Sequence, residues 1–563
     1  MNNIYQSVKP ARTILPKFIS TSSGHVQKQQ LVEFRPENTS TFSYSTNNEM
    51  IINIDSPSDL FLPDDSYLRA EITATAQYGG VDAGERYLSE GGVQSVARDI
   101  ILETQNGVEI ARMPRYNKFY ATMSQVYHSR EHINSCLGRE GDSAECVYDE
   151  MGGEFNYYQR LSGTVTVGAA GAVTGDGTLA LNELNVGDLF FVTTNAGGGK
   201  SYHATVTAIT DDEDFTLSTA VEAAEGSLIY KLSLPSTPNK AIRNVALTTN
   251  NNGKGYIFTL QLALNEFKSI KAFPLFLLKG GLRVRIILER PAYVMALPVD
   301  VSDEKLSISN VDYTIKNPVF MASMMTPSPV LMKHYYDMYN AGGIHFHSLG
   351  VLHTLETLEG SAQTRVITMN PNKRSAKFIF GKIQNLRAET ETALSGVNPG
   401  KSTFTCDSVA QGLRAGLRNY IFEVGTLRFP LNKPVDLEND ISHSEAMVEL
   451  QRVKDDLGSY ISGKRFRPID FQNRVNRLRP YESTQLADAQ RLVISANLCR
   501  DRTPMAGIDI SLNNLRFIGD FDQYEISDLD GEEAAQSTRY VHLWLLYDKL
   551  ITLQKDSGLV VRA

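Results

Sequence analysis

The sequence predicts a mainly β protein built from two antiparallel β-sandwiches in tandem. Three observations predict this fold class. Short apolar segments with strand-like alternation recur along most of the chain, two stretches of comparable length repeat a plan of many strands with one or two helices, and no βαβ alternation indicates a parallel sheet. Because 563 residues exceed what one hydrophobic core usually organises, more than one domain is expected.

The first half contains clear strand, turn and helix signals. Residues 67–75 alternate strictly between apolar and polar side chains, as expected for a strand with one face in a core. Residues 282–288 follow a similar pattern. Asn106-Gly107 lies between two apolar runs and predicts a β-hairpin. Residues 116–128 have apolar side chains along one side and predict a helix.

The second half repeats this pattern of strands and helices after a segment that contains proline and aspartate at residues 295–303. Helices are predicted near 329–339 and over 444–457. The predicted strands are 306–320, 344–355, 377–383, 420–429, 492–498, 508–517 and 541–553. Antiparallel sandwiches of this kind include the jelly rolls.

A segment of different composition interrupts the first half at about residues 162–234. It is rich in Gly, Ala, Thr and Val, and turns separate its short alternating runs, which is typical of a small β-barrel or sandwich. The predicted strands are 164–167, 189–192, 204–209 and 215–217. The predicted organisation is an extended N-terminal arm at 1–40, a first sandwich at 41–298 interrupted by the inserted domain at 162–234, and a second sandwich at 299–563.

The composition and net charge favour some classes of protein and argue against others. Hydrophobic residues make up 42% and charged residues 21%, as in ordinary globular proteins, and a net charge of -9 argues against a dedicated nucleic-acid binder. The predicted arm is locally basic. Its charged residues are Lys9, Arg12, Lys17, Lys28 and Arg35 against Glu33 and Glu37.

Four cysteines without a Cys-x-x-Cys pair favour a reducing compartment over a disulfide framework. They are Cys136, Cys146, Cys406 and Cys499. A local disulfide between Cys136 and Cys146 stays open as an alternative. No signal peptide is recognised over residues 1–16, and no apolar stretch approaches the length that spans a bilayer, so a soluble protein made in the cytosol or nucleus is predicted.

Three groups of residues invite a chemical interpretation. Gly197-Gly-Gly-Lys-Ser201 resembles a phosphate-binding loop, but Thr194 occupies the position of the first glycine, so a flexible turn is the better interpretation. His345, His347 and His353 lie in one predicted strand and could suit a metal, yet no further ligand is set by spacing.

The four acids at 211–214 lack the spacing of a calcium loop and predict a solvated turn. Trp544 lies in an apolar run and predicts core packing. No nucleophile elbow, zinc-protease motif or kinase loop occurs in the sequence. We therefore predict no catalytic residue, no cofactor, no metal site and no enzymatic activity.

Several passages together resemble a known family. The passages are Met50–Asp55 with Leu62–Ile72, Asn265–Leu278 with Gly281–Leu288, Glu423–Pro430 with Pro434, Pro504–Ile510, and Val541–Val561. In this order they resemble the double jelly-roll major capsid proteins of polinton-like viruses and virophages and, more distantly, of nucleocytoplasmic large DNA viruses. The resemblance covers about residues 40–160 and 240–563, and it depends on the order of the passages because none is a fixed motif.

The resemblance implies two jelly rolls and a homotrimeric, pseudo-hexagonal capsomer in the icosahedral shell of a double-stranded DNA virus. The implied partners are further copies of the chain and penton and minor capsid proteins. The arm would contact an internal membrane or the genome, and the insertion would form a tower that could bind a host receptor. The implied location is the virion capsid, with assembly in the host cytoplasm or nucleus.

Two alternatives belong to other classes of protein. The β-rich insertion would suit a viral spike, fibre or receptor-binding surface protein, although fibres usually show sequence repeats and none is visible. A carbohydrate-active β-sandwich enzyme would need exposed tryptophans for sugar stacking, and a single Trp argues against it.

Overall fold

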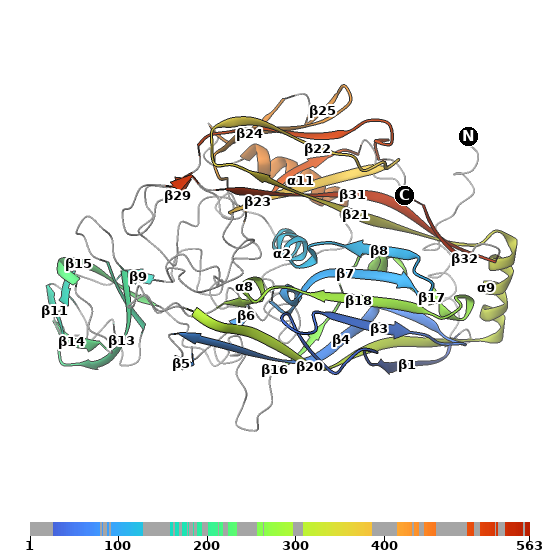
Figure 1. Ribbon diagram of the computed structural model, residues 1–563, viewed down its shortest axis with the longest axis horizontal. Coiled ribbons are helices and arrows are strands. Elements are labelled where there is room, and N and C mark those ends of the chain that lie inside the picture. Colours follow the sequence, from blue (N-terminus) through green and yellow to red (C-terminus); the bar gives the residue numbers. More distant parts are fainter. Residues whose placement is uncertain are drawn as a thin grey trace.

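The computed structural model describes most of the two predicted halves. The described ranges are 26–78, 92–127, 256–262, 264–296, 308–385, 414–430, 433–438, 444–457, 492–499, 507–523, 538–555 and 558–562, with shorter pieces at 81–82, 87–88, 158–160, 164–167, 172–176, 178, 184, 189–193, 201–211, 213–217, 223–232, 412, 525–526 and 535–536. Two stacked β-sandwiches occupy most of the molecule, and a small separate β unit lies at one end (Figure 1).

The first sandwich pairs two sheets. One has the strand order β1-β20-β4-β16 and the other β3-β18-β7-β8. Their bounds are β1 (Val26–Phe34), β3 (Glu49–Ile54), β4 (Leu60–Tyr78), β7 (Ala97–Thr104), β8 (Glu109–Met113), β16 (Tyr256–Leu260), β18 (Leu282–Leu288) and β20 (Ile308–Pro327). Counted along the chain, the first, eighth, third and sixth strands form one sheet, and the second, seventh, fourth and fifth form the other. This is the strand order of a jelly roll.

The second sandwich repeats that order. Its sheets are β21-β31-β23-β27 and β22-β28-β24-β25. The bounds are β21 (Ile344–Leu358), β22 (Gln363–Met369), β23 (Ala376–Asn385), β24 (Leu417–Val424), β25 (Leu427–Phe429), β27 (Ile494–Asn497), β28 (Leu515–Phe521) and β31 (Arg539–Gln554). The chain therefore contains two complete jelly rolls, as the sequence predicted.

Shorter strands extend these sheets. In the first roll they are β2 (Thr41–Ser43), β5 (Val81–Asp82) and β17 (Phe273–Pro274), and in the second β26 (Val435–Asp436) and β32 (Gly558–Arg562). Two separate pairs join β6 (Tyr87–Leu88) to β19 (Met295–Ala296) and β29 (Glu525–Ile526) to β30 (Ala535–Gln536).

The boundaries of the first roll differ from the predicted ones. β1 lies within the predicted arm, yet it pairs along its length with β20. β20 lies beyond the predicted boundary at residue 299, yet it pairs with β4 from Ile308 opposite Tyr78 to Met325 opposite Leu60. The boundary at 298/299 was therefore wrong, because it followed a local change in composition, whereas the eighth strand of a jelly roll returns between the first and third. Residues 1–25 lie outside the described residues.

The three predicted helices are confirmed. They are α2 (Tyr116–Tyr127), α9 (Pro329–Ala341) and α11 (Ser444–Leu457), and the short helical segments are η2 (Gly92–Val96), α7 (Asn265–Ser269), η4 (Leu275–Leu277) and α8 (Pro291–Val294). α9 connects the two rolls. It begins where the Ser328 side chain accepts a hydrogen bond from the Leu331 amide, at 3.3 Å, and where Pro329 occupies the first turn. No described helix is both long and apolar enough to cross a membrane.

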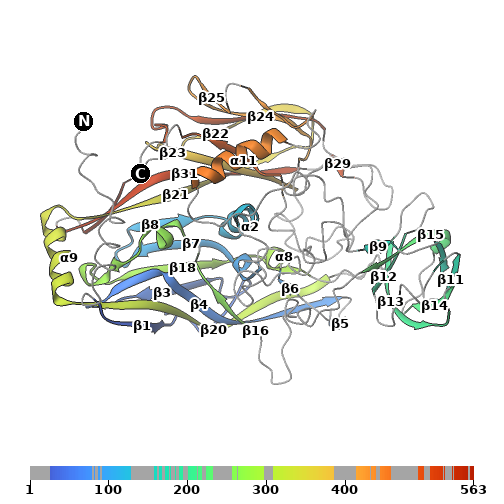
Figure 2. The same cartoon turned by 180° about the vertical axis from the view of Figure 1, so that it is seen from behind.

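The inserted segment forms its own sheet. Its strand order is β10-β11-β14-β13-β12-β15-β9, and because β10 also pairs with β15, six of its strands form a closed barrel. The bounds are β9 (Tyr158–Arg160), β10 (Thr164–Val167), β11 (Ala172–Asp176), β12 (Leu189–Thr193), β13 (Ser201–Ile209), β14 (Asp214–Leu217) and β15 (Ala223–Leu232). The four predicted strands are confirmed. In the chain the barrel lies between β8 and β16, the fifth and sixth strands of the first roll (Figure 2).

Two turn glycines allow a matched test of backbone strain. Gly281 has a φ of +75°, and a Cβ there would lie 2.3 Å from the Ile54 carbonyl oxygen. Gly107, in the predicted β7–β8 hairpin, has a φ of +81° with open space around it. Gly281→Ala should lower the free energy of unfolding by roughly 2 kcal/mol or more, and Gly107→Ala by about 1 kcal/mol. Urea unfolding of both variants measures the difference. Equal losses of unfolding free energy would contradict a steric conflict between a Cβ at Gly281 and the Ile54 carbonyl oxygen.

Candidate functional site: the interface between the two rolls

The interface between the two rolls brings together apolar and charged side chains from distant parts of the chain. β21 and β31 of the second roll face α2, β8 and α7 of the first (Figure 1). Phe119 on α2 meets Trp544 on β31 with ring centroids 5.9 Å apart, and Phe273 meets Phe346 at 5.6 Å. These contacts join the two rolls into one continuous hydrophobic core.

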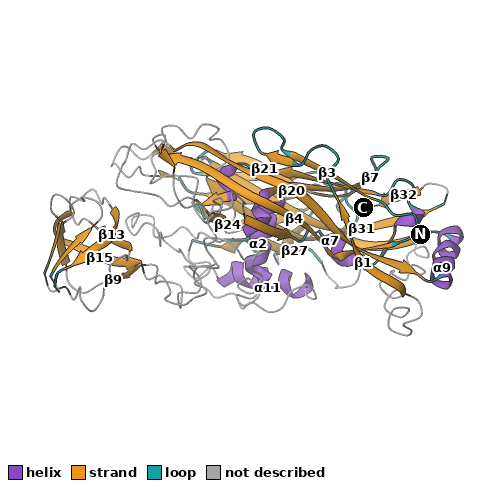
Figure 3. Ribbon diagram, turned by 90° about the horizontal axis from the view of Figure 1, so that it is seen from below, coloured by secondary structure: helices purple, strands orange, loops and turns teal. Residues whose placement is uncertain are grey.

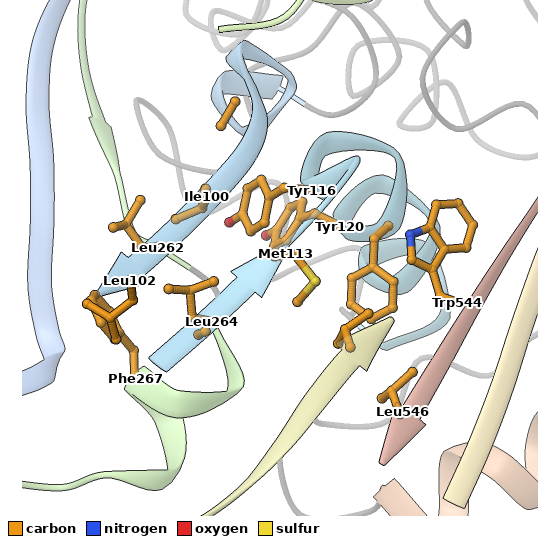
Figure 4. Packing of buried hydrophobic residues seen from close by; sticks show 14 of the residues in the cluster. Ile100, Leu102, Met113, Tyr116, Tyr120, Leu262, Leu264, Phe267, Trp544 and Leu546 are labelled. Carbon is orange, nitrogen blue, oxygen red and sulfur yellow. The ribbon is translucent and has the colours of Figure 1, made fainter. Parts of the chain in front are cut away.

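Figure 4 shows how the two rolls meet around α2. Tyr116, Tyr120 and Met113 come from the first roll, while Trp544 and Leu546 approach from β31. All five side chains are buried. Trp544 is 1% exposed, so the prediction that it packs in a core is confirmed. The second roll therefore completes the apolar surroundings of α2.

A buried ion pair crosses this interface. The Lys549 ammonium on β31 donates hydrogen bonds to the Glu266 carboxylate on α7 and to the Ile110 carbonyl oxygen on β8, the latter at 2.7 Å. Lys549 is 4% and Glu266 3% exposed. An unpaired charge in such surroundings is costly, so each residue depends on the other roll for its partner.

A second polar cluster surrounds α2. The Lys118 ammonium donates to the Tyr293 hydroxyl at 3.0 Å and lies 3.4 Å from His542 Nε2 on β31. His542 Nδ1 is in turn 3.0 Å from His353 Nε2, so one of these ring nitrogens donates and the other accepts. The Lys382 ammonium donates to the Lys118 carbonyl oxygen at 3.5 Å. The cluster links both rolls through hydrogen bonds that fix direction as well as distance.

Asp548 organises a third cluster within the second roll. The carboxylate accepts hydrogen bonds from His347 Nε2 at 2.8 Å and from the Ser375 hydroxyl, and the Lys377 ammonium lies 3.1 Å away. Burial raises the pKa of Asp548, but the hydrogen bonds from His347 and Ser375 and the charge of Lys377 outweigh it and leave the pKa below its ordinary value. Asp548 is therefore held as a carboxylate at neutral pH.

The predicted histidines do not gather into a ligand set. His345 Nδ1 lies 3.0 Å from the Thr552 hydroxyl, while His347 and His353 have the partners described above. All three partners lie on β31. Among the described residues no group of three or more His, Cys, Asp or Glu side chains is arranged to hold a metal.

The remaining residues that the sequence singled out either form turns and strands or lie outside the described residues. Asp211 Oδ1 accepts hydrogen bonds from the amides of Glu213 and Asp214, which is a turn between β13 and β14. Ser201 begins β13, and Gly197–Lys200 lie outside the described residues, as do Cys136, Cys146 and Cys406. Cys499 lies partly buried just after β27.

The sequence interpretation missed the charged residues of the interface. Lys549 stands within the apolar run 541–553, and Lys118 stands among the aromatic residues of α2. A charge inside an otherwise apolar segment was the available signal, since such a residue must find a partner when the segment is buried. The identity of that partner depends on the packing of the rolls.

Two complete rolls of the same strand order, joined by a buried interface, make the chain a double jelly-roll protein. The sequence matches no family model and no curated protein.

Comparison with solved structures finds viral capsid proteins. PBCV-1 VP54, fitted into a reconstruction of the virophage Sputnik, has a TM-score of 0.46 at 8% identity, covering 96% of this chain and 98% of that one. The mavirus major capsid protein has a TM-score of 0.41 at 11% identity, covering 96% and 90%. The protein of Sulfolobus Turreted Icosahedral Virus has a TM-score of 0.33 at 6% identity, covering 92% and 91%.

The ion pair across the interface gives a stability test. Lys549→Met leaves Glu266 buried without its partner and should lower the free energy of unfolding by about 3–5 kcal/mol, while Lys549→Met with Glu266→Met should recover much of that loss. The exposed pair Lys271–Asp64, at 2.9 Å, is the control, because Lys271→Met should cost less than about 1 kcal/mol. Thermal and urea unfolding measure each variant. An equal loss for both lysines would contradict a cross-roll role for Lys549.

The lowered pKa of Asp548 predicts a pH-dependent contribution. A depressed folded-state pKa stabilises the fold above the unfolded value, about 3.9 for Asp, and the contribution is lost as pH falls through the folded pKa. Asp548→Asn should therefore be less stable than the natural protein at pH 7, and the difference should shrink below about pH 4. Urea unfolding of both proteins from pH 7 to pH 3.5 checks this, and a difference independent of pH would contradict it.

Proposed function

We propose that this chain is the major capsid protein of a double-stranded DNA virus, and that three copies form a pseudo-hexagonal capsomer of an icosahedral shell. The observation that carries the proposal is the repeated strand order of two jelly rolls within one chain. Three such chains supply six similar rolls, and repeated head-to-tail contacts between similar units close into a ring when the rotation permits.

The interface between the rolls supports a structural role. Its charged groups, including Lys118 and Lys549, bind partners in the other roll and set the placement of one roll on the other. A capsomer needs such a defined placement, because an error in the angle between rolls would be repeated at every position of a shell. We therefore propose a shell subunit without enzymatic activity that resides in the virion capsid after assembly in the host cytoplasm or nucleus.

The two ends of the molecule carry different elements, so they would face opposite sides of a shell. The barrel lies at one end, and α9 lies at the other (Figures 1 and 2). Val26, the first residue of β1, pairs with Pro327, two residues before α9, so the part of the basic arm that precedes β1 is attached to the fold at the α9 end. We propose that the barrel faces outward, where a host receptor could bind it. The arm would then face inward, toward an internal membrane, the genome or minor capsid proteins.

Oligomeric state tests the proposal directly. Light scattering of the purified protein should give the mass of three chains, and electron microscopy should show particles with a hexagonal outline. A variant without residues 158–234 should keep this mass and outline, because β9 and the six barrel strands pair only with one another among the described residues. A monomer with glycosidase activity, or an elongated fibre, would contradict the proposal and favour one of the alternative classes.

A further inference from the structure

Two histidines lie at the contact between the rolls. His353 on β21 and His542 on β31 stack with ring centroids 5.3 Å apart, and His542 also stacks on Trp544 at 5.6 Å. His542 is fully buried, and Trp544 lies beside α2 (Figure 4). α2 is midway along the molecule, whereas α9 is at one end (Figure 3). The histidine pair is therefore inside the contact between the rolls and not at an end of the molecule.

The hydrogen bonds of this pair have a single possible direction. An ammonium group only donates, so His542 Nε2, which lies 3.4 Å from the Lys118 ammonium, must accept. The proton of the His542 ring is then on Nδ1, which donates to His353 Nε2 at 3.0 Å. Because each Nε2 atom accepts a hydrogen bond, both histidines are neutral and each has one tautomer.

A further proton on either ring would break this series of hydrogen bonds. On His542 it would place an N–H group against the Lys118 ammonium. On His353 it would place an N–H group against the Nδ1–H group of His542. In both cases a donor would face a donor inside the protein, so the arrangement persists only while both rings are neutral.

The nearby charges also oppose protonation. The Lys118 ammonium is fully buried and donates to the Tyr293 hydroxyl on α8 at 3.0 Å. Lys382 on β23 pairs with His542 in the strand register and is 1% exposed. Its ammonium lies 6.0 Å from the centroid of the Trp544 ring. A protonated histidine would therefore add a positive charge beside two buried cations.

The buried Glu289 carboxylate, next to α2, has other partners. It accepts hydrogen bonds from the Asn117 side chain at 3.0 Å and from the Arg290 amide at 2.9 Å, and the Arg115 guanidinium lies 3.9 Å away. Among the described residues, the charged groups that face the histidine pair are therefore the two ammonium groups.

His347, on the same strand as His353, has the opposite surroundings. Its Nε2 atom donates to the Asp548 carboxylate at 2.8 Å, and a carboxylate accepts from both the neutral and the protonated ring. Protonation of His347 therefore preserves its hydrogen bond, whereas protonation of His353 or His542 removes one. Acid acts on the two sites of one sheet in opposite directions.

We propose that the His353–His542 pair is an acid-sensitive switch, and that the contact between the two rolls loosens when either ring takes up a proton. Histidine in an unfolded chain takes up a proton below about pH 6.5. The unfolded chain then binds more protons than the folded chain, so the free energy of unfolding is highest above this pH and falls as the pH falls below it.

The switch belongs to a contact within one chain and does not depend on the proposed function. In the proposed shell subunit it would link the placement of one roll on the other to the acidity of the surroundings.

Trp544 reports directly on the switch, because it is the single tryptophan of the chain. Its fluorescence should shift to longer wavelength as the pH falls from 6.5 to 4.5, since a loosened contact admits water to the indole ring. Over the same range, the equilibrium constant for urea unfolding should rise by up to about tenfold per pH unit for each histidine that stays neutral in the folded chain.

Substitutions locate the effect. His353→Gln with His542→Gln keeps an amide oxygen that can accept from Lys118 and removes both titrating rings, so the fluorescence shift and the steep rise in the unfolding constant should disappear. His353→Gln alone, at a half-buried position, should halve the slope of the unfolding constant against pH. His347→Gln is the matched control on the same sheet and should retain both effects.

The outcomes are distinct from those that test the proposed function. A fluorescence maximum that stays constant from pH 6.5 to 4.5 in the natural protein would overturn the switch. A double variant, or His353→Gln if the double variant does not fold, with the full pH dependence of the natural protein would overturn it as well. Neither result changes the oligomeric state on which the capsomer proposal is judged.

Discussion

The structure depends on the burial of the β21–β31 sheet against α2, β8 and α7. This contact is both apolar, through Phe119 and Trp544, and charged, through Lys549 and Glu266. Apolar packing alone tolerates small shifts, whereas a buried ammonium must meet its acceptors at hydrogen-bond distance. The combination therefore holds two rolls, each with its own pair of sheets, in one relative placement.

The candidate site was only partly predictable. Core placement of Trp544 followed from its apolar run, and the three histidines were recognised as residues of one strand. Their partners on β31 were not predictable, because residues such as His347 and Asp548 are 201 positions apart and meet only through strand pairing. The cross-roll pair of Lys549 and Glu266 is separated by 283 positions and was missed for the same reason.

By itself the sequence determined the local elements: the alternation of β4, the β7–β8 hairpin, the three longer helices and four strands of the inserted segment. These depend on side-chain periodicity and turn residues, which act between near neighbours in the chain. Only the tertiary structure decided that β1 and β20 complete the first roll, since a strand belongs to the sheet with which it pairs and not to the segment with which it is contiguous. The tertiary structure also decided which charges are buried, because burial depends on the packing of one roll against the other.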